Sequence, residues 1–522
     1  MSREVYDFVV IGSGFGGSIM SMVLRRLGKA VLMVEQGKHP RFAIGESSTP
    51  FANLLLEQIA DDYDLPFLRD FAEWGSWQEK HPNIAVGLKR GFTFYHHEFG
   101  TELNFSDRAR QLLVAASPND RVADTHWYRP QFDECLLRKA VELGVSYLDE
   151  TTVSSLVRVG DHWEIELSNQ DSNCAVKAGF IIDATSANCA LARHLPIEIE
   201  KFAAMPRTSS VWAHFRNVKR LDEFDRALRS DELPYPPDDA AVHHVFPGGW
   251  IWVLRFNNGI TSAGAAYTEQ VELSKGSAEE KWSELITRIP LLAWQFKGSE
   301  PVTPFFSANR LSFIRSEFVG PGWALLPSAA GFVDPLLSTG FALTLLGITR
   351  LAGAVSGSIV ELKSFGQQTR IELDAAADLV GALYAKMDSF DEFALLALLY
   401  FAAMSYTETV WRLGKNDRAA GFLLSSEPEV SRKRAAICAD ARAGRRITQE
   451  RIADAISAYD IAGLCDWKRD HWYPVNLNDL VQNREKVGAS EVELNELFRK
   501  LKLEPLNDQS PRARMHSKMI VD

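Results

Sequence analysis

Three glycines near the start of the chain have the spacing that binds the pyrophosphate of a dinucleotide. They are Gly12, Gly14 and Gly17 of GSGFGG, with Phe15 after the second. The first permits a tight turn, the second lets backbone approach a pyrophosphate, and the third lets a helix pack closely on a strand. Glu35 follows Gly17 by 18 residues, where a carboxylate can accept hydrogen bonds from ribose hydroxyls. The pattern predicts a site for NAD or FAD, and a glycine-rich turn without a ligand is the alternative.

The elements that must position these residues are a strand, a helix and a second strand. YDFVVI, residues 6–11, is continuous, apolar and β-branched, as is typical of a buried parallel strand. Residues 18–28 have helical periodicity and end in a glycine, and residues 30–34 form a second strand that ends at Glu35. This order is that of a Rossmann-type unit, in which the helix N-terminus faces the pyrophosphate.

Three further segments contain residues that could do chemistry. The first, residues 41–50 (RFAIGESSTP), follows the second strand, and the second, residues 127–133 (WYRPQFD), precedes an amphipathic helix. The third, residues 323–340 (WALLPSAAGFVDPLLSTG), runs from a strand through small residues into another helix. Taken singly, each has a structural explanation, because serine and threonine are good helix N-caps and arginine is mostly found at the surface. Their order along the chain is what makes them informative together.

The four blocks, which lie within residues 1–350, resemble the flavin-dependent halogenases of the phenol and pyrrole type and their relatives among FAD-dependent monooxygenases and geranylgeranyl-reductase-like flavoproteins. The resemblance implies an α/β fold with an FAD-binding Rossmann-type domain like that of hydroxybenzoate hydroxylase. One departure is that Pro327-Ser328 stands where the family usually has Gly-Asp, which puts a ribityl contact in doubt. The residues implied to bind FAD are Gly12, Gly14, Phe15, Gly17, Glu35, Arg41, Glu46, Ser47, Arg129 and Asp334.

The resemblance also implies a reaction. Reduced FAD and O2 would form a C4a-hydroperoxyflavin, halide would attack its distal oxygen, and a lysine amine would deliver the resulting hypohalous acid to an electron-rich carbon. Lys89, in GLKRGFTFY, matches the family lysine, whereas Lys80 lies in a polar stretch. A solvated lysine at a strand edge is the alternative. Burial of Lys89 would lower its pKa and favour a haloamine.

A pair of tryptophans favours a halogenase over an ordinary monooxygenase. Trp250 and Trp252, in GWIWVLR, match the W-x-W-x-I-P motif that lines the space beside the flavin in halogenases, although Leu254 and Arg255 replace the usual Ile-Pro. Alternating aromatic residues are also ordinary composition for a sheet strand. The position of this block between the flavin segments supports the functional interpretation.

Residues 338–340, S-T-G, precede a helical pattern and are expected to bind halide. The residue before them bears on the class of substrate. Backbone N–H groups at the start of a helix favour anions. Leu337 stands where tryptophan halogenases carry a glutamate that assists removal of the ring proton, and phenols and pyrroles need less such help. We therefore expect a phenol or a similarly activated small aromatic substrate, free or bound to a carrier protein. The residues expected at the halide and flavin face are Pro335, Ser338, Thr339 and Gly340.

Three hypotheses about function remain open. The first is a halogenase of natural-product biosynthesis, for example in the chlorination of an antibiotic, with reduced FAD supplied by a separate flavin reductase because no second GxGxxG is present. The second is an FAD-dependent monooxygenase or reductase of the same fold, which the Leu254-Arg255 replacement favours. The third is a non-catalytic FAD-binding protein, which the intact S-T-G helix start opposes.

The remaining sequence suggests three regions. An FAD-binding domain is expected over 1–350, interrupted by an antiparallel substrate-side sheet from about 85–110 and 200–320, where aromatic and polar residues alternate. After residue 350 the pattern is helical and predicts a cap or lid over 351–522, with a frayed end at 508–522.

Composition narrows the class of protein. The chain has 522 residues and a net charge of −11, which argues against nucleic-acid binding. Five cysteines without a C-x-x-C and a start without a signal-peptide pattern suggest the cytoplasm. The longest apolar run, residues 393–404, is too short to predict a transmembrane helix. The histidine pairs at 96–97 and 243–244 lack metal-ligand spacing, so no metal is expected.

Overall fold

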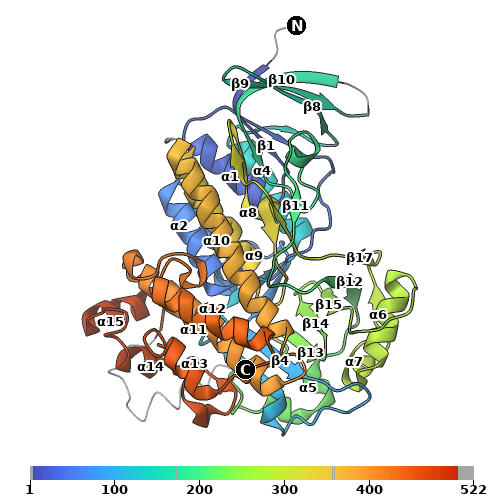
Figure 1. The fold of residues 1–522 in the computed structure, drawn as a ribbon, viewed down its shortest axis with the longest axis vertical. Helices are drawn as coiled ribbons and strands as arrows, with labels where there is room; N and C mark the ends of the chain where they lie inside the picture. Colours follow the sequence, from blue (N-terminus) through green and yellow to red (C-terminus); the bar gives the residue numbers. More distant parts are fainter. Residues whose placement is uncertain (1–3, 171–172, 356, 358, 504–522) are drawn as a thin grey trace.

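The computed structural model describes residues 4–170, 173–355, 357 and 359–503 of the chain. The expected frayed stretch, 508–522, lies outside these residues. Figure 1 shows a sheet domain at the top, a second sheet at the lower right and helices at the lower left, with the long helix α10 (Ile359–Tyr384) running between them. The fold is the predicted mixture of an α/β nucleotide-binding domain, a second sheet and a helical C-terminal region.

The first sheet is built on the predicted strand–helix–strand unit, β1 (Glu4–Ile11), α1 (Phe15–Arg26) and β2 (Val31–Val34). Its parallel strands follow the order β20-β10-β1-β2-β7, so the ends of β1, β2 and β10 meet at one edge. The strands that complete it are β7 (Ser146–Leu148), β8 (Thr152–Val159), β9 (His162–Ser168), β10 (Asn173–Asp183), β19 (Val319–Gly320) and β20 (Trp323–Leu325).

The second sheet has the order β16-β12-β15-β14-β13-β4-β5-β22 and is mostly antiparallel. Two pairs are parallel, β13 with β4 and β22 with β5, and β22 comes from the C-terminal region. Its strands are β4 (Gly91–His96), β5 (Gln111–Ala115), β12 (Thr208–Arg216), β13 (Ala241–Phe246), β14 (Gly249–Arg255), β15 (Thr261–Thr268), β16 (Glu300–Pro301), β17 (Phe306–Ala308) and β22 (Trp472–Tyr473).

Among the described residues, five shorter strands form two small sheets of their own. β3 (Val86–Lys89) pairs with β6 (Asp124–Trp127) in an antiparallel ribbon, and this ribbon holds the lysine that the sequence singles out. β11 (Ile199–Glu200), β18 (Phe313–Arg315) and β21 (Gly331–Phe332) form a small sheet near the segment that leads into α9 (Thr339–Ala354).

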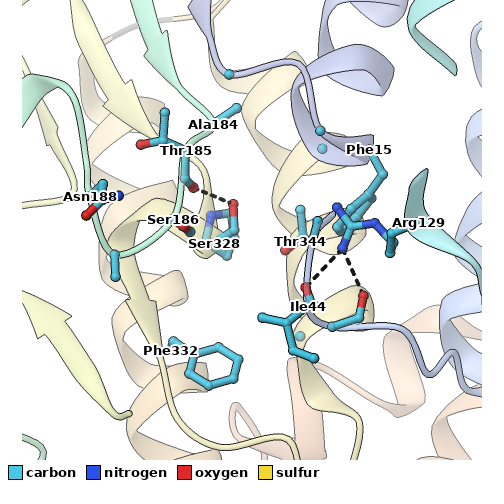
Figure 2. A pocket seen from close by; sticks show the side chains of 18 of the residues that line it. Phe15, Ile44, Arg129, Ala184, Thr185, Ser186, Asn188, Ser328, Phe332 and Thr344 are labelled. Atoms are coloured by element: carbon cyan, nitrogen blue, oxygen red, sulfur yellow. Dashed lines mark hydrogen bonds between the residues drawn. The ribbon is translucent and has the colours of Figure 1, made fainter. Parts of the chain in front are cut away.

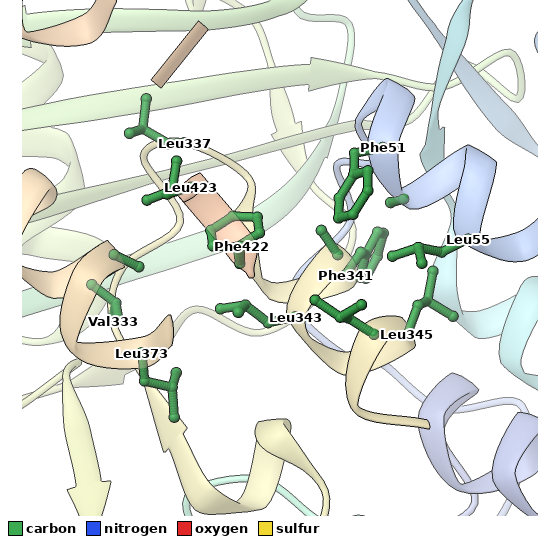
Figure 3. Close-up of a cluster of buried hydrophobic side chains, with 14 of the residues drawn as sticks. Phe51, Leu55, Val333, Leu337, Phe341, Leu343, Leu345, Leu373, Phe422 and Leu423 are labelled. Atoms are coloured by element: carbon green, nitrogen blue, oxygen red, sulfur yellow. The ribbon is translucent and has the colours of Figure 1, made fainter. Parts of the chain in front are cut away.

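The helices pack around α9, whose residues are almost all buried. Figure 3 shows side chains of α9 between α2 (Pro50–Asp62) and the segment around Phe422 and Leu423. One continuous core therefore joins the nucleotide-binding domain to the C-terminal helices. The other helices are α3 (Trp74–Lys80), α4 (Arg129–Glu142), α5 (Leu221–Phe224), α6 (Ala278–Thr287), α7 (Pro290–Gln295), α8 (Pro327–Ala330), α11 (Phe390–Arg412), α12 (Pro428–Arg442), α13 (Gln449–Ile456), α14 (Leu477–Gln482) and α15 (Glu491–Lys500).

Helix α11 contains the longest apolar run. Within the described residues it is the single helix whose length and composition would allow it to cross a membrane, and 78% of its apolar window is buried inside the protein. Such burial is that of a core helix, since a membrane-spanning helix needs its apolar surface for lipid.

Candidate active site

A cavity of about 650 Å³ lies along the carboxyl edge of the first sheet. Its wall combines the glycine loop, the loops after β2 and β10, and the segment from α8 to α9. Figure 2 shows Phe15 and Arg129 on one side of this cavity and Thr185, Ser186 and Ser328 on the other. The predicted site residues that line it are Gly12, Gly14, Phe15, Glu35, Arg41, Arg129, Trp252, Pro335, Thr339 and Gly340.

At one end of the cavity, Glu35 is held by several donors. Its Oε2 accepts from the Ser13 N–H and from an Arg41 guanidinium N–H, each at 3.0 Å, and its Oε1 accepts from the Gly37 N–H at 3.0 Å. Burial acts to raise the pKa of Glu35, but Arg41 and the backbone donors outweigh it, so the pKa lies below its ordinary value. Glu35 is therefore a fixed carboxylate at the end of β2.

The three glycines occupy different environments. Gly12 has φ +100°, which a side chain would make strained, and a Cβ on Gly17 would lie 1.9 Å from the carbonyl oxygen of Gly12. A Cβ on Gly14 would lie 3.5 Å from the nearest Arg129 nitrogen, an ordinary contact. The absence of a side chain on Gly17 lets α1 pack behind the cavity. The absence of a side chain on Gly14 leaves the cavity open beside the backbone.

Arg129 lies in the cavity wall with most of its donors engaged. It forms a double hydrogen bond to Asp133, with both distances 2.7 Å, and donates to the carbonyls of Ile44 and Gly45 (Figure 2). Its guanidinium carbon is also 4.9 Å from the centre of the Phe15 ring. These contacts fix the Gly45 loop against α4. Arg129 therefore holds the shape of the cavity wall and also places a positive charge in it.

Glu46 and Ser47 lie outside the cavity wall. Glu46 is buried, and its Oε1 is 2.8 Å from Nε2 of His214 on β12, while its Oε2 has no partner among the described residues. Ser47 pairs with His126 through a β-bridge. The next residue but one, Thr49, caps α2 by accepting from the Ala52 N–H at 3.3 Å. The segment therefore joins the cavity to the second sheet, and its helix-cap interpretation also holds.

The far end of the cavity is formed by the start of α9. Ser338 adopts a left-handed conformation, φ +53°, and its buried N–H donates to the Pro335 carbonyl at 3.0 Å. Thr339 and Gly340, the first residues of the helix, line the cavity, and a Cβ on Gly340 would meet nothing within 4 Å. Free N–H groups of a helix start thus face this end of the cavity.

Behind this end lies a buried hydrogen-bonded chain. Trp250 Nε1 donates to the Tyr384 hydroxyl at 3.1 Å, and that hydroxyl donates to Asp334 Oδ2 at 2.9 Å. The Leu336 N–H donates to Asp334 Oδ1 at 3.0 Å. Burial raises the pKa of Asp334 to about 7, and these donors oppose the rise only in part. Asp334 and Trp250 therefore fix the loop before α9 from behind.

Lys89 is fully buried, which makes the strand-edge alternative wrong. Its amine donates to the carbonyl oxygen of Ser48 and lies 3.9 Å from the centre of the Phe92 ring. Burial lowers the pKa of Lys89 to about 7, and the charge of Asp124, its register partner on β6, opposes this fall. Lys80, the competing lysine, is exposed and pairs with Asp70.

A second cavity, of about 190 Å³, lies next to Lys89. Phe92, whose ring contacts the lysine amine, is part of its wall, as is Thr49, the residue after Ser48. Its lining is mostly apolar and aromatic and combines α2, β4, β5, α11 and the C-terminal segment: Pro50, Phe51, Val114, Tyr400, Phe401, Met404, Glu408, Ile461, Leu464, Tyr473 and Leu480 are among its residues.

Several buried groups outside the predicted site residues lie near Lys89 or Asp334. His243 lies 4.4 Å from Phe94 and 5.2 Å from Trp250, measured between ring centres. Burial lowers the pKa of His243 to about 3, and the charge of Lys89 acts in the same direction. Asp124 and Asn53 bond to each other at 2.8 Å beside Lys89. Tyr384 holds Asp334. The one signal that could have indicated Asp124 is its place just ahead of the WYRPQFD block.

The departures from the halogenase motifs have structural explanations. Arg255, in place of proline, bonds to Asp238 at 2.8 Å and to backbone carbonyls of residues 218–219, at the end of β14 and away from both cavity walls. Ser328, in place of aspartate, lines the first cavity and donates to the Thr185 carbonyl at 3.3 Å (Figure 2). Among the described residues, no group of three or more potential metal ligands comes together.

Comparison with known proteins agrees with this geometry. The sequence profile of the tryptophan halogenase family matches residues 122–393, just over half of the chain. Monodechloroaminopyrrolnitrin halogenase PrnC of Pseudomonas fluorescens is 28% identical over 399 residues, which cover 74% of this chain and 69% of that one. The 1H-pyrrole-2-carbonyl-[peptidyl-carrier protein] chlorinase of Pseudomonas fluorescens is 27% identical over 370 residues, or 69% of this chain and 77% of that one.

The fold is shared with solved halogenase structures. Halogenase PltM in complex with phloroglucinol and FAD superposes with a TM-score of 0.73 at 22% identity, covering 96% of this chain and 97% of that one. The architecture is thus that of an FAD-binding oxidoreductase with a second sheet and a helical C-terminal region. The chain belongs to the tryptophan halogenase family and is a flavin-dependent enzyme whose cofactor is FAD.

The first cavity fits this cofactor. Because Gly14 has no side chain, a pyrophosphate can approach the backbone there. The buried Nε of Arg41 has no partner among the described residues and is free to bind an anion. Glu35 lies at the end where an adenosine ribose would be held.

Proposed function

We propose that the chain is a halogenase that transfers a halogen to a small activated aromatic ring, phenolic or similar, with Lys89 as the delivering group. The observation that carries the proposal is the buried Lys89 amine, which contacts the ring of Phe92 in the wall of the smaller, apolar cavity. An exposed lysine could not deliver an oxidant without losing it to water.

In this proposal the first cavity holds FAD. Glu35 would accept from the ribose, Arg41 and the start of α1 would neutralise the pyrophosphate, and Ser328 would stand near the ribityl chain. Reduced FAD, together with O2 and halide, would supply hypohalous acid at the α9 end. We infer that a separate flavin reductase provides the reduced cofactor, because the sequence contains one GxGxxG motif.

The N–H groups at the start of α9 would hold the halide. Thr339 and Gly340 line the cavity at this end, and the partial positive charge of the helix N-terminus favours an anion there. The apolar Leu337, buried before this turn, offers no carboxylate to remove a ring proton. This supports a substrate ring that is already activated.

In this proposal Lys89 carries the halogen toward the second cavity, whose wall includes Phe92 beside its amine. Hypohalous acid can be hydrogen-bonded by the amine or can react with its neutral form, R–NH2 + HOX → R–NHX + H2O, after which the halogen passes to the aromatic carbon and the amine is restored. Burial favours the neutral form because it lowers the pKa of Lys89. The side chain is held in place by Ser48 and Phe92.

We assign the substrate to the second cavity. Its volume of about 190 Å³ and its aromatic and aliphatic walls suit one or two fused rings, and Phe92 separates it from the Lys89 amine. Residues 461–480 and α11 close this cavity, so the region 351–522 would act as the cap over the substrate. The carrier-bound substrate named for one relative is the other form that this cavity could receive, through the exposed edge at Pro474–Asn476.

The test compares Lys89→Met with Lys80→Met. Wild-type protein, reduced FAD, O2 and chloride or bromide are supplied with phenols, pyrroles and indoles, and products are read by mass spectrometry. We expect a halogen isotope pattern that falls at least about 10²-fold in Lys89→Met and stays unchanged in Lys80→Met, with oxidation of reduced FAD retained in both.

Halogenated product in Lys89→Met at the wild-type rate would overturn the role of Lys89. Hydroxylated products that form without halide would instead support the monooxygenase hypothesis.

A further inference from the structure

Asp124 is the acidic partner of Lys89. The two residues stand opposite each other in the β3–β6 ribbon, and both are almost completely buried. Among the described residues, Asp124 is the one charged group whose effect on Lys89 is to hold its proton in place. A buried amine and a buried carboxylate in facing positions form a pair that can exchange one proton without any net change in buried charge.

The Asp124 carboxyl is held on one side and free on the other. Its Oδ1 accepts from Asn53 Nδ2 at 2.8 Å, and Asn53 Oδ1 accepts from the Ser48 hydroxyl at 2.6 Å. Its Oδ2 has no hydrogen-bond partner among the described residues. Since the Ser48 carbonyl receives the Lys89 amine, a single network positions the amine and the carboxyl together.

The surroundings leave no other group to exchange this proton. His126 and His243 face Lys89, and burial lowers the pKa of both, so they stay neutral. Glu408 and Arg412 act on Asp124 from α11 with opposite signs, and they are bonded to each other at 2.7 Å. The carboxyl of Asp124 is therefore the proton acceptor that this buried region offers to Lys89.

We propose that Asp124 is the positioning residue and proton partner of Lys89: it takes a proton from the ammonium so that the nitrogen lone pair can receive halogen, and it returns that proton when the halogen leaves. The steps balance as Lys-NH3⁺ + Asp-COO⁻ → Lys-NH2 + Asp-COOH, then Lys-NH2 + HOX → Lys-NHX + H2O. The N–X bond next breaks as the ring carbon takes X⁺; the carboxylic acid supplies the nitrogen with its proton and the carboxylate formed takes the proton that the ring releases. The inference rests on the proposed role of Lys89.

The experiment measures halogenated product per reduced FAD consumed in Asp124→Asn, Asp124→Glu and Asp120→Asn. Asparagine keeps the shape of the side chain but cannot carry the proton, so we expect a fall of about 10²-fold, with FAD binding unchanged and free hypohalous acid appearing in a chemical trap. Asp124→Glu restores a carboxyl and should recover part of the loss. Asp120, an exposed partner of Arg90, should leave the rate unchanged.

The pH dependence separates a proton role from a structural one. In the wild type the rate should depend on the shared proton of the pair, and in Asp124→Asn the limb of the profile that belongs to the carboxyl should vanish. If Asp124→Asn does not retain FAD, Asn53→Ala keeps the carboxyl but removes its anchor, and it should lower product per reduced FAD about 10-fold.

A double-variant comparison distinguishes this inference from the proposed function. In the Lys89→Met background, Asp124→Asn should cause no further loss, because Asp124 acts through the lysine. Wild-type yields and pH profile in Asp124→Asn, with Lys89→Met inactive, would overturn the role of Asp124 alone. Wild-type yields in Lys89→Met would overturn the function on which it rests.

Discussion

The glycine-loop cavity and the buried polar groups near it differ in how they treat charge. These groups, called the buried wall, are Lys89, Asp124, Trp250, Asp334 and Tyr384. The cavity presents backbone N–H groups, a glycine-lowered wall and a carboxylate whose pKa is held down by Arg41. The wall contains Lys89, Asp124 and Asp334, which burial pushes toward their uncharged forms. The cavity offers a charged ligand donors and open space, whereas in the proposed function the wall would move a proton and keep an oxidant from water.

Because the two regions differ in this way, different kinds of substitution should impair each of them. In the cavity, function depends on space beside the backbone, so added atoms are harmful. In the wall, each polar group has few partners, so loss of one hydrogen bond leaves another group buried and unsatisfied. Predictions for the two regions can therefore be set against each other.

The largest expected effect separates two glycines of the same loop. Gly17→Ala places a Cβ 1.9 Å from the Gly12 carbonyl oxygen, so we expect the free energy of unfolding to fall by about 3 kcal/mol or more. Gly14→Ala meets only ordinary contacts and should fold normally but bind FAD more weakly. Thermal unfolding and flavin retention measure both. Equal losses of stability would show that the loop is not packed as described.

A smaller effect is expected in the wall. Tyr384→Phe removes the hydroxyl between Trp250 and Asp334, and we expect a loss of about 1–3 kcal/mol in the free energy of unfolding and weaker halide dependence. Tyr406→Phe removes a half-buried hydroxyl bonded to the Lys486 carbonyl and is the matched control, with a loss below about 1 kcal/mol. Denaturant unfolding curves of the two variants decide between these outcomes, and equal losses would contradict the special role of the wall.

The smallest effect is a difference in pH dependence. Asp334 has its folded pKa raised to about 7 from an ordinary 3.8, so its contribution to stability is lost as pH rises from about 4 to 7, at up to about 1.4 kcal/mol per pH unit. Glu35 has a folded pKa below its ordinary 4.5, so its contribution is present at neutral pH and is lost in acid, as pH falls through the lowered folded pKa.

The measurement is unfolding at several pH values for Asp334→Asn and Glu35→Gln. Relative to the wild type, Asp334→Asn should gain stability between pH 4 and 7. Glu35→Gln should be less stable than the wild type at pH 7, and this difference should shrink as the solution becomes acidic. The same slope in both variants would contradict the contrast between the two regions.

Local sequence was sufficient for the glycine loop. Gly12, Gly14 and Gly17 lie within one turn of a strand–helix unit, and Glu35 closes the next strand, so their geometry follows from nearest-neighbour structure. The start of α9 at Ser338–Gly340 was predicted for the same reason. The place of Glu46 outside the cavity wall was not predicted, because its pairing with His214 depends on β12, which is 168 residues away.

By itself, the sequence determined the nucleotide-binding unit, the family resemblance and the lysine to examine. Only the tertiary structure decided that Lys89 is buried, that it faces Asp124 across two strands, and that a second cavity lies beside it. That cavity is assembled from α2, β4, α11 and residues 461–480, which are far apart in the chain. Burial and the pKa changes that it causes belong to packing between such distant segments, and no local pattern of residue types records them.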